Sequence, residues 1–250
     1  MPNATQRRLA ALAGALAALV ALQACNTPPA PTDVWDPYEA QNRDTHAGNV
    51  AVDRALLRPA ARAWGEGVPE PVRQGAVNFA TNLQAPGDVV NDVLQGAGED
   101  AVHNLFRFVI NSTLGIGGLF DPASSFGLEH RDTDFGETLF VWGAPEGAYL
   151  ELPLLGPSTE RDAIGRVVDI VINPLSSIAP DVPVWVSPTG RVVQIVDTRD
   201  RLAVSIDGIL YESADSYAQS RTIYLQNRRF ELGDEAEDTY FDPYEDLYGE

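Results

Sequence analysis

The chain of 250 residues has a single cysteine, Cys25, and no lysine, so all 17 of its basic residues are arginine. One cysteine cannot form an internal disulfide, and burial alone must hold a chain of this length together. The 36 acidic residues give a formal net charge of −19. Nucleic-acid binding demands a basic face, so this balance excludes that class of partner. It also excludes a polybasic patch as the means of membrane attachment.

Catalytic motifs are missing as well. The sequence has no Gly-x-Ser-x-Gly elbow, Walker loop or His-Glu-x-x-His motif. The three histidines are scattered without metal-ligand spacing, and we expect no metal site: His46, His103 and His130. Residues 115–118 resemble a phosphate loop, but they follow a predicted helix, so we interpret them as a helix breaker and tight turn. We therefore predict a protein that is not an enzyme and has no cofactor.

The N-terminus is a bacterial signal peptide. Arg7 and Arg8 precede an apolar run that ends in Leu22-Gln23-Ala24-Cys25. The run is shorter than the roughly 20 residues that a membrane-spanning helix needs. We expect Cys25 to be lipidated and to become the new N-terminus after cleavage; the alternative is an ordinary secretory signal in which Cys25 is incidental. Asn26 stands where Asp would favour the inner membrane, so we expect a lipid anchor in the outer membrane, on the periplasmic side.

The sequence divides into four regions. Residues 1–24 are the signal peptide, 25–35 a lipidated tether rich in Pro and Thr, and 36–230 one helical domain. Residues 231–250 carry nine acids and no base, which predicts a disordered acidic tail. Removal of the signal peptide takes away two arginines and changes the formal charge from −19 to −21.

The fold class we predict is all-α, with short extended segments. Asp36 as N-cap, Pro37 at N1 and Glu39 at N3 predict a helix that ends before Pro59. A second helix is expected from residue 69 or 70 to just before Pro86. The other expected elements are helices 86–94, 98–111, 134–142, 159–173 (capped by Ser158), 190–211 and 215–228, an extended segment at 149–155, and a loop at 173–188.

The segments 98–111 and 190–211 are apolar on more than one face. Such a helix is either deeply buried or in contact with lipid. Either segment taken alone fits both interpretations.

These residues together resemble the MlaA (VacJ) family of outer-membrane lipoproteins, over about residues 36–230. The matching positions begin with Asp36-Pro37-Tyr38-Glu39 and are densest between 134 and 162. They include Asn42-Arg43, Arg58-Pro59, Val68-Pro69, Asn78-Phe79, Leu94-Gln95-Gly96, Arg107-Phe108, Asn111-Ser112-Thr113, Gly117-Gly118, Asp134-Phe135-Gly136, Trp142-Gly143, Leu152-Pro153, Gly156-Pro157-Ser158, Arg161-Asp162 and Tyr224-Leu225-Gln226. The chain departs from the family at Gln41, Phe140, Ala148 and Ser216.

The resemblance implies a ring of amphipathic helices in the inner leaflet of the outer membrane. It implies association with a trimeric porin, and passage of misplaced phospholipid through the ring to a periplasmic carrier protein. It also makes Gln41-Asn42-Arg43 a candidate segment for control of the lipid path. Arg107 and Arg161 are candidates for phosphate contact, although structural pairing with Asp is the commoner role. Two other functions remain open: a structural lipoprotein that braces porins or envelope layers, and a lipase.

Overall fold

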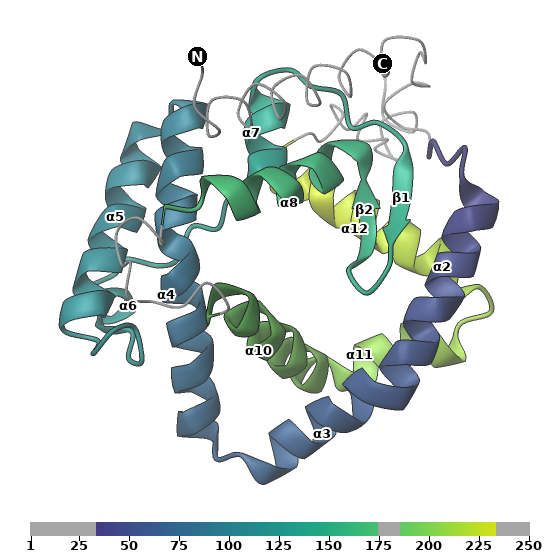
Figure 1. Ribbon diagram of the computed structural model, residues 1–250, viewed down its shortest axis with the longest axis horizontal. Helices are drawn as coiled ribbons and strands as arrows, with labels where there is room; N and C mark the ends of the chain where they lie inside the picture. The colour runs from purple at the N-terminus through teal and green to yellow at the C-terminus, as the bar shows by residue number, and fades with distance from the viewer. Residues whose placement is uncertain (1–33, 175–185, 234–250) are drawn as a thin grey trace, which may run out of the picture.

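The computed structural model describes residues 34–174 and 186–233, and these wind into a ring around a central opening (Figure 1). Helices α2, α3 and α4 form three sides, and α8, the hairpin β1–β2 and α12 close the fourth. The bounds are α2 (Glu39–Val52), η1 (Asp53–Leu57), α3 (Arg58–Gly67), α4 (Glu70–Gln95), α5 (Gly98–Thr113), α6 (Pro122–Ser125), α7 (Phe135–Val141), β1 (Tyr149–Leu152), β2 (Gly156–Thr159), α8 (Glu160–Ile172), α10 (Val186–Arg201), α11 (Ala203–Asp207), η2 (Gly208–Glu212) and α12 (Ser216–Glu231). The predicted all-α, ring-like class is confirmed.

The prediction that the first helical segment ends before Pro59 is wrong. The chain passes from α2 through one π-helical turn, η1, directly into α3, where Pro59 occupies the first turn. The backbone N–H of Arg58 donates to the carbonyl of Asp53, five residues back. This wider turn starts a new helical register, in which Pro59 falls where a missing N–H costs nothing.

The predicted break at Pro86 is also wrong. Helix α4 continues through Pro86 for 26 residues, and Pro86 is buried within it. An internal proline costs about 3 kcal/mol of helix stability. Because α4 packs against both α5 and α10, tertiary contacts along its length outweigh that cost.

The predicted capping role of Asp36 is wrong too. The N-cap of α2 is Tyr38, and Asp36 instead accepts hydrogen bonds from Asn42 (2.9 Å), Tyr217 and Arg221. Asp36 therefore joins α2 to α12, from the opposite end of the chain.

Other predicted boundaries shift by smaller amounts. Thr159, not Ser158, caps α8, because residues 156–159 pair with β1 as the second strand of an antiparallel hairpin. The predicted helix 190–211 is broken into α10, α11 and η2, and α10 begins at Val186, inside the predicted loop. The turn at 115–118 is confirmed, with Gly117 and Gly118 at positive φ. Trp185 and residues 234–250 of the predicted acidic tail lie outside the described residues, and the first tail residue, Glu231, ends α12.

The interior of the ring wall is mostly polar. Among the described residues, 18 buried side chains are polar or charged and 11 are hydrophobic. The hydrophobic cluster is small and lies where the hairpin meets α12: Tyr149, Tyr217 and Leu225. Hydrogen bonds and ion pairs between distant segments therefore decide how the ring closes.

The ion pair that joins α2 to α12 gives a prediction about how stability depends on pH. Arg43 of α2 holds both carboxylate oxygens of Asp215, the N-cap of α12, at 3.0 and 2.9 Å. This pairing, helped by the backbone N–H of Ala218, lowers the pKa of Asp215 from 3.8 to about 2. A depressed pKa means that ionised Asp215 stabilises the fold above about pH 4 and loses that effect as the pH falls toward 2.

We expect Asp215→Asn to lower the urea midpoint at pH 7, with the difference from wild type shrinking between pH 4 and pH 2. Because the pair is exposed, the difference should also shrink at high salt. Asp44→Asn, at the exposed position next to Arg43 in α2, is the control and should give no such pH dependence. A difference that stays constant from pH 7 to pH 2 would contradict this role of Asp215.

Candidate functional site

The outer face of the ring beside α5 is apolar. The exposed residues of this helix recur at helical spacing: Val102, Leu105, Phe106 and Val109. Its buried face is mostly polar, with Asn104, Arg107 and Asn111 beside Ala101. In a water-soluble bundle the two faces would be reversed, so this arrangement favours contact with lipid over deep burial.

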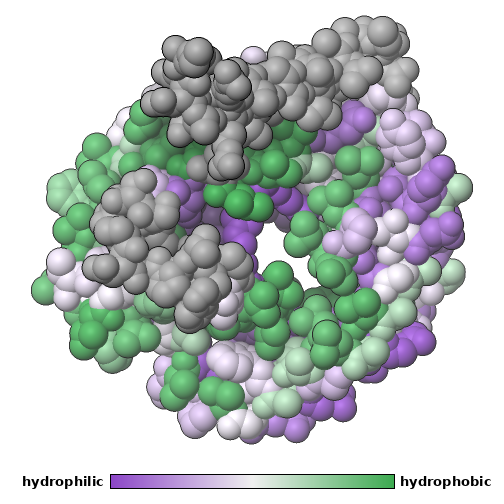
Figure 2. Space-filling model, viewed as in Figure 1, coloured by the Kyte–Doolittle hydropathy of each residue, from purple (hydrophilic) through white to green (hydrophobic). Residues whose placement is uncertain are grey.

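The apolar surface continues past the end of α5. Exposed hydrophobic side chains follow in the segment 114–126 and at the end of α7: Leu114, Ile116, Leu119, Phe120, Phe126, Val141 and Trp142. Figure 2 shows green side chains gathered on this side of the molecule. Trp142 is 56% exposed, with its indole N–H donated to the carbonyl of Leu94, as suits a membrane–water boundary. We call this surface, from α5 to Trp142, the apolar belt.

A cavity of about 1000 Å³ occupies the middle of the ring. Its walls come from α2, η1, α4, the segment 132–134, the hairpin, α8, α10 and η2, so elements from the whole length of the domain line it. Figure 2 shows that an opening passes through the molecule at this place. We call this cavity the lumen. Its volume is at the upper end of the range for small-molecule sites.

The lumen has two kinds of wall. One is apolar and is formed by η1, the hairpin tip and α10, with side chains that include Leu56, Leu57, Leu154, Leu155, Val192 and Ile195. The other is polar and is formed by α4, the segment 132–134 and α8, with Asp88, Asn91, Asp132, Asp134, Arg166 and Asp169. In Figure 2, green and purple side chains meet around the opening. The lumen is therefore amphipathic in cross-section.

Burial inside the ring raises the pKa of two carboxylates on the polar wall. Asp169 accepts hydrogen bonds from Asn91 (2.9 Å) and the backbone N–H of Phe135 (3.2 Å), yet burial raises its pKa. Asp132 is reached by water from the lumen but is surrounded by protein on its other sides. This desolvation, together with the charge of Asp88, raises the pKa of Asp132. The polar wall thus holds negative charge that is incompletely neutralised.

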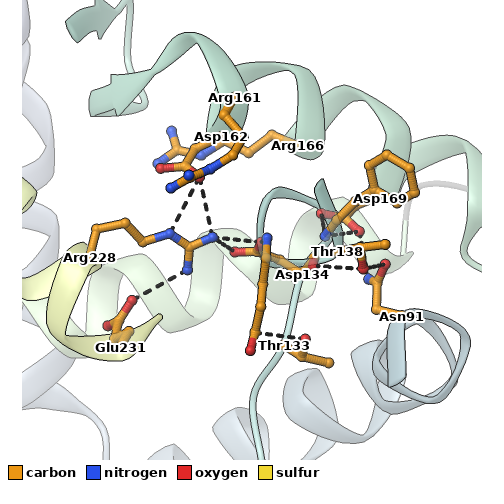
Figure 3. Close-up of polar contacts among 12 residues, drawn as sticks. Asn91, Thr133, Asp134, Thr138, Arg161, Asp162, Arg166, Asp169, Arg228 and Glu231 are labelled. Carbon is orange, nitrogen blue, oxygen red and sulfur yellow. Dashed lines mark hydrogen bonds and ion pairs between the residues drawn. The ribbon is translucent and has the colours of Figure 1, made fainter. Parts of the chain in front are cut away.

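An ion-pair network behind the polar wall joins three elements (Figure 3). Arg228 of α12 pairs with Asp134 at 2.7 Å and with Asp162 at 3.3 Å. Burial opposes ionisation of Asp162, but Arg228 and the Tyr224 hydroxyl outweigh it and lower the pKa of Asp162. Because the three partners come from α12, the start of α7 and α8, this network closes the ring at its C-terminal side.

A second network closes the opposite side. Arg199 of α10 donates to both oxygens of Asp53 at 2.8 and 3.0 Å and to Asp207 at 2.5 Å. Tyr211 adds a hydrogen bond to Asp53 at 2.5 Å. Asp53 opens η1 and Tyr211 lies in η2, so both π-helical turns are joined at the same buried carboxylate, which Arg199 neutralises.

Helix α2 holds the hairpin in place. The buried Asn42 donates to the carbonyl of Tyr149 (3.0 Å) and accepts from the N–H of Glu151 (2.9 Å). Asn49 accepts from the N–H of Leu154 at 2.7 Å and donates to Leu152 at 3.0 Å. The tip of the hairpin, which carries Leu154 at φ 65°, reaches toward the opening (Figure 1). We call these bonds the hairpin clamp.

The residues predicted from sequence are distributed as follows. Asn42 belongs to the hairpin clamp, Gln41 is exposed and Arg43 pairs with Asp215; none of the three lines the lumen. Arg107 is buried in α5, where it bonds Ser124, Leu128 and Asp121. Arg161 is buried 3.7 Å from Asp162, with its guanidinium over the ring of Phe140. Neither arginine lines the lumen, and phosphate contact by either stays a prediction. Cys25 lies outside the described residues.

Sequence reasoning missed the polar wall. Asp88, His130 and Asp132 lie close enough together, within 4.8 Å between ligand atoms, to be compatible with a metal ion. The three residues come from α4 and a loop 42 residues later, so no local spacing could indicate them. Asp88 accepts from His130 at 3.1 Å; burial opposes protonation of His130, but Asp88 outweighs it and raises the pKa.

None of the helices in the described ranges is both long enough and apolar enough to cross a membrane.

Comparison with known proteins gives consistent matches. A family model described as MlaA lipoprotein matches residues 34–231. The chain is 36% identical over 200 residues to the intermembrane phospholipid transport system lipoprotein MlaA of Escherichia coli K12, covering 78% of this chain and 77% of that protein. The protein of the same name from Haemophilus influenzae is 33% identical over 208 residues, covering 80% of each.

A solved structure gives the same result for the fold. It comes from work on the structural basis for maintenance of bacterial outer membrane lipid asymmetry, with a TM-score of 0.69 and 36% sequence identity. The match covers 79% of this chain and 98% of that one.

Proposed function

The chain belongs to the MlaA lipoprotein family, and we propose that it conducts phospholipids through its lumen. As a member of this family it is a lipoprotein of intermembrane phospholipid transport that maintains the lipid asymmetry of the outer membrane. The observation that carries the lumen proposal is the amphipathic cavity of about 1000 Å³ inside a ring whose outer belt is apolar.

Physical chemistry explains why a lipid path needs both walls. A charged headgroup in bare hydrocarbon loses its solvation, which costs at least several kcal/mol. Acyl chains in water cost about 0.8 kcal/mol for each exposed CH₂ group. The polar wall of α4 and α8 lowers the first cost, and the apolar wall of η1, the hairpin tip and α10 lowers the second.

We place the ring in the inner leaflet of the outer membrane, with the lipid on Cys25 as its anchor. The apolar belt would contact acyl chains, and its size supports an embedded rather than a peripheral position. We further propose that a trimeric porin holds the ring in the membrane and that a soluble periplasmic carrier receives the lipid. Transport is passive in the ring itself, and its partners set the direction.

Deletion of the gene tests this function. We expect phospholipid exposed at the cell surface to rise, because lipid misplaced in the outer leaflet is no longer removed. An unchanged level would leave the structural alternative, in which the protein braces porins or envelope layers. A lipase would instead release fatty acid when the purified protein is incubated with phospholipid, and we expect no release.

The anchor gives a second prediction. Cys25→Ala should leave a soluble periplasmic protein, because the ring loses the only covalent lipid we assign to it. Surface-exposed phospholipid should then rise to the level of the deletion. Fractionation with an antibody against the chain locates the variant; a variant that stays in the membrane fraction and keeps full function would contradict the assignment of Cys25.

The hairpin clamp gives a third prediction. Asn42→Ala removes two hydrogen bonds to β1, one of them from a buried backbone N–H. We expect a free energy of unfolding lower by about 1–3 kcal/mol and a hairpin tip that moves more freely in the lumen. Hydrogen exchange at residues 150–155 should accelerate, and surface-exposed phospholipid should change. Gln41→Ala, at the exposed neighbouring position, is the control; equal effects of the two variants would argue against the clamp.

A further inference from the structure

The lumen carries charges of both signs. Among the residues that line it are six carboxylates and three arginines. Four of the carboxylates, Asp53, Asp88, Asp134 and Glu151, are paired inside the ring wall with arginine or histidine. The other two carboxylates, Asp132 and Asp169, and two of the arginines have no ion-pair partner among the described residues and are available to a molecule in the lumen.

The available carboxylates form one group on the polar wall. Asp88 and Asn91 lie one turn apart on α4, Asn91 bonds Asp169 of α8, and Asp132 lies close enough to Asp88 for their charges to repel. Within the described ranges, Asp88 has His130 as a partner at 3.1 Å, whereas neither Asp132 nor Asp169 is at ion-pair distance from a basic residue, and Asp132 has no hydrogen-bond partner. This group therefore presents an excess of negative charge to the lumen.

The available arginines flank this group. Arg166 lies one turn before Asp169 on α8 and gives one hydrogen bond to the carbonyl of Pro157 at 3.2 Å. Arg191 begins the lumen-facing part of α10 and is near enough to Asp169 to favour its ionised form without an ion pair. Across the described residues, neither guanidinium has a carboxylate partner within 4.0 Å.

A headgroup with a phosphate and a primary ammonium matches this arrangement. Arginine suits phosphate because its planar N–H groups meet two oxygens at once. A primary ammonium has three N–H donors, as lysine does, and the carboxylates of Asp132 and Asp169 on one wall can accept from it. A quaternary ammonium has no N–H to donate, and a glycerol headgroup has no cation and leaves the lipid with a net negative charge.

We propose that the lumen preferentially accepts phospholipids whose headgroup joins a primary ammonium to the phosphate, such as phosphatidylethanolamine. The phosphate lies toward Arg166 and Arg191, and the ammonium toward Asp132 and Asp169, beside the Asp88–His130 pair. This inference rests on the proposed function, because it requires that phospholipid enters the lumen.

A photo-crosslinking competition tests the preference. A photoreactive amino acid replaces Val192, a lumen-lining residue that is 57% exposed, in the full lipidated chain purified in detergent. The protein is incubated with equal amounts of phosphatidylethanolamine, phosphatidylcholine and phosphatidylglycerol that carry identical acyl chains. After illumination, mass spectrometry identifies the attached lipid, so only lipid inside the lumen is counted.

We expect phosphatidylethanolamine to exceed phosphatidylglycerol about tenfold, the ratio that one additional charge-assisted hydrogen bond gives, with phosphatidylcholine between them. Equal labelling by all three lipids would overturn the inference and leave the proposed function standing. No labelling by any lipid would overturn both.

Two variants and one control identify the residues that produce the preference for phosphatidylethanolamine. Asp132→Asn should reduce the ratio several-fold without disturbing the fold, because the Asp132 side chain is exposed to the lumen and makes no hydrogen bond within the described residues. Asp44→Asn makes the same change of charge outside the lumen and should leave the ratio unchanged. Arg191→Gln should reduce labelling by all three lipids and keep their ratio. A ratio insensitive to Asp132→Asn would contradict the assignment of the ammonium to this wall.

Discussion

Leu155→Asp should abolish phospholipid transport while leaving the fold intact. Leu155 lies at the tip of the hairpin on the apolar wall of the lumen and is 59% exposed, so the fold does not depend on burying it. An ionised carboxylate at this point meets acyl chains that cannot solvate it. Even a small part of the several kcal/mol that such contact costs suffices for a tenfold loss of rate.

Surface-exposed phospholipid measures this result and should rise to the level of the gene deletion. Leu202→Asp is the matched control, because Leu202 is 50% exposed and lies outside the lumen. Both variants should be present in the membrane at the wild-type level. Normal transport by Leu155→Asp would mean that acyl chains do not pass the hairpin tip.

Arg199→Met should cause the largest loss of stability. Arg199 is 4% exposed and neutralises Asp53, which is 6% exposed, as well as Asp207. Methionine fills much of the same volume but leaves the Asp53 carboxylate buried, with Tyr211 as its one remaining donor among the described residues. Removal of one partner of a buried pair costs about 3–5 kcal/mol.

Urea unfolding of the purified protein checks this value. Arg201→Met is the control on the same helix, since Arg201 is 66% exposed and its ion pair with Asp197 is 3.7 Å long. We expect that control to change the free energy of unfolding by less than about 1 kcal/mol. In the double variant Arg199→Met, Asp53→Asn, part of the lost stability should return because the unpaired charge is gone. Similar losses for the two arginine variants would show that the Asp53 network does not close the ring.

Local sequence patterns predicted the helices and strands better than the positions where they begin, end or join one another. The spacing of apolar residues identified α5 and α8, and the resemblance supplied the ring. Pro59 and Pro86 misled the prediction because both are read locally as helix breakers, whereas a π-helical turn and packing on two sides allow the helices to continue. The assignment of Asp36 failed for a related reason, since its partner Arg221 lies 185 residues away.

The candidate site was less accessible to sequence reasoning. An apolar residue on α5 and one on α10 give the same pattern, although Val109 lies on the outer belt and Val192 lines the lumen. The carboxylates of the polar wall could not be separated from the many others in an acidic chain, because Asp88, Asp132 and Asp169 meet only after the ring closes. Arg107 and Arg161 suit phosphate by residue type, but burial and existing partners hold them inside the wall.

Reversible obstruction of the lumen tests the central claim most directly. Thr198 lines the lumen and is exposed, and Cys25 is the only native cysteine, so Thr198→Cys adds one thiol that a bulky thiosulfonate reagent can modify. Surface-exposed phospholipid in cells that carry this variant should rise to the level of the gene deletion on modification and fall again after reduction. Complete modification of Thr198→Cys with no change in surface-exposed phospholipid would show that lipid does not travel through the ring.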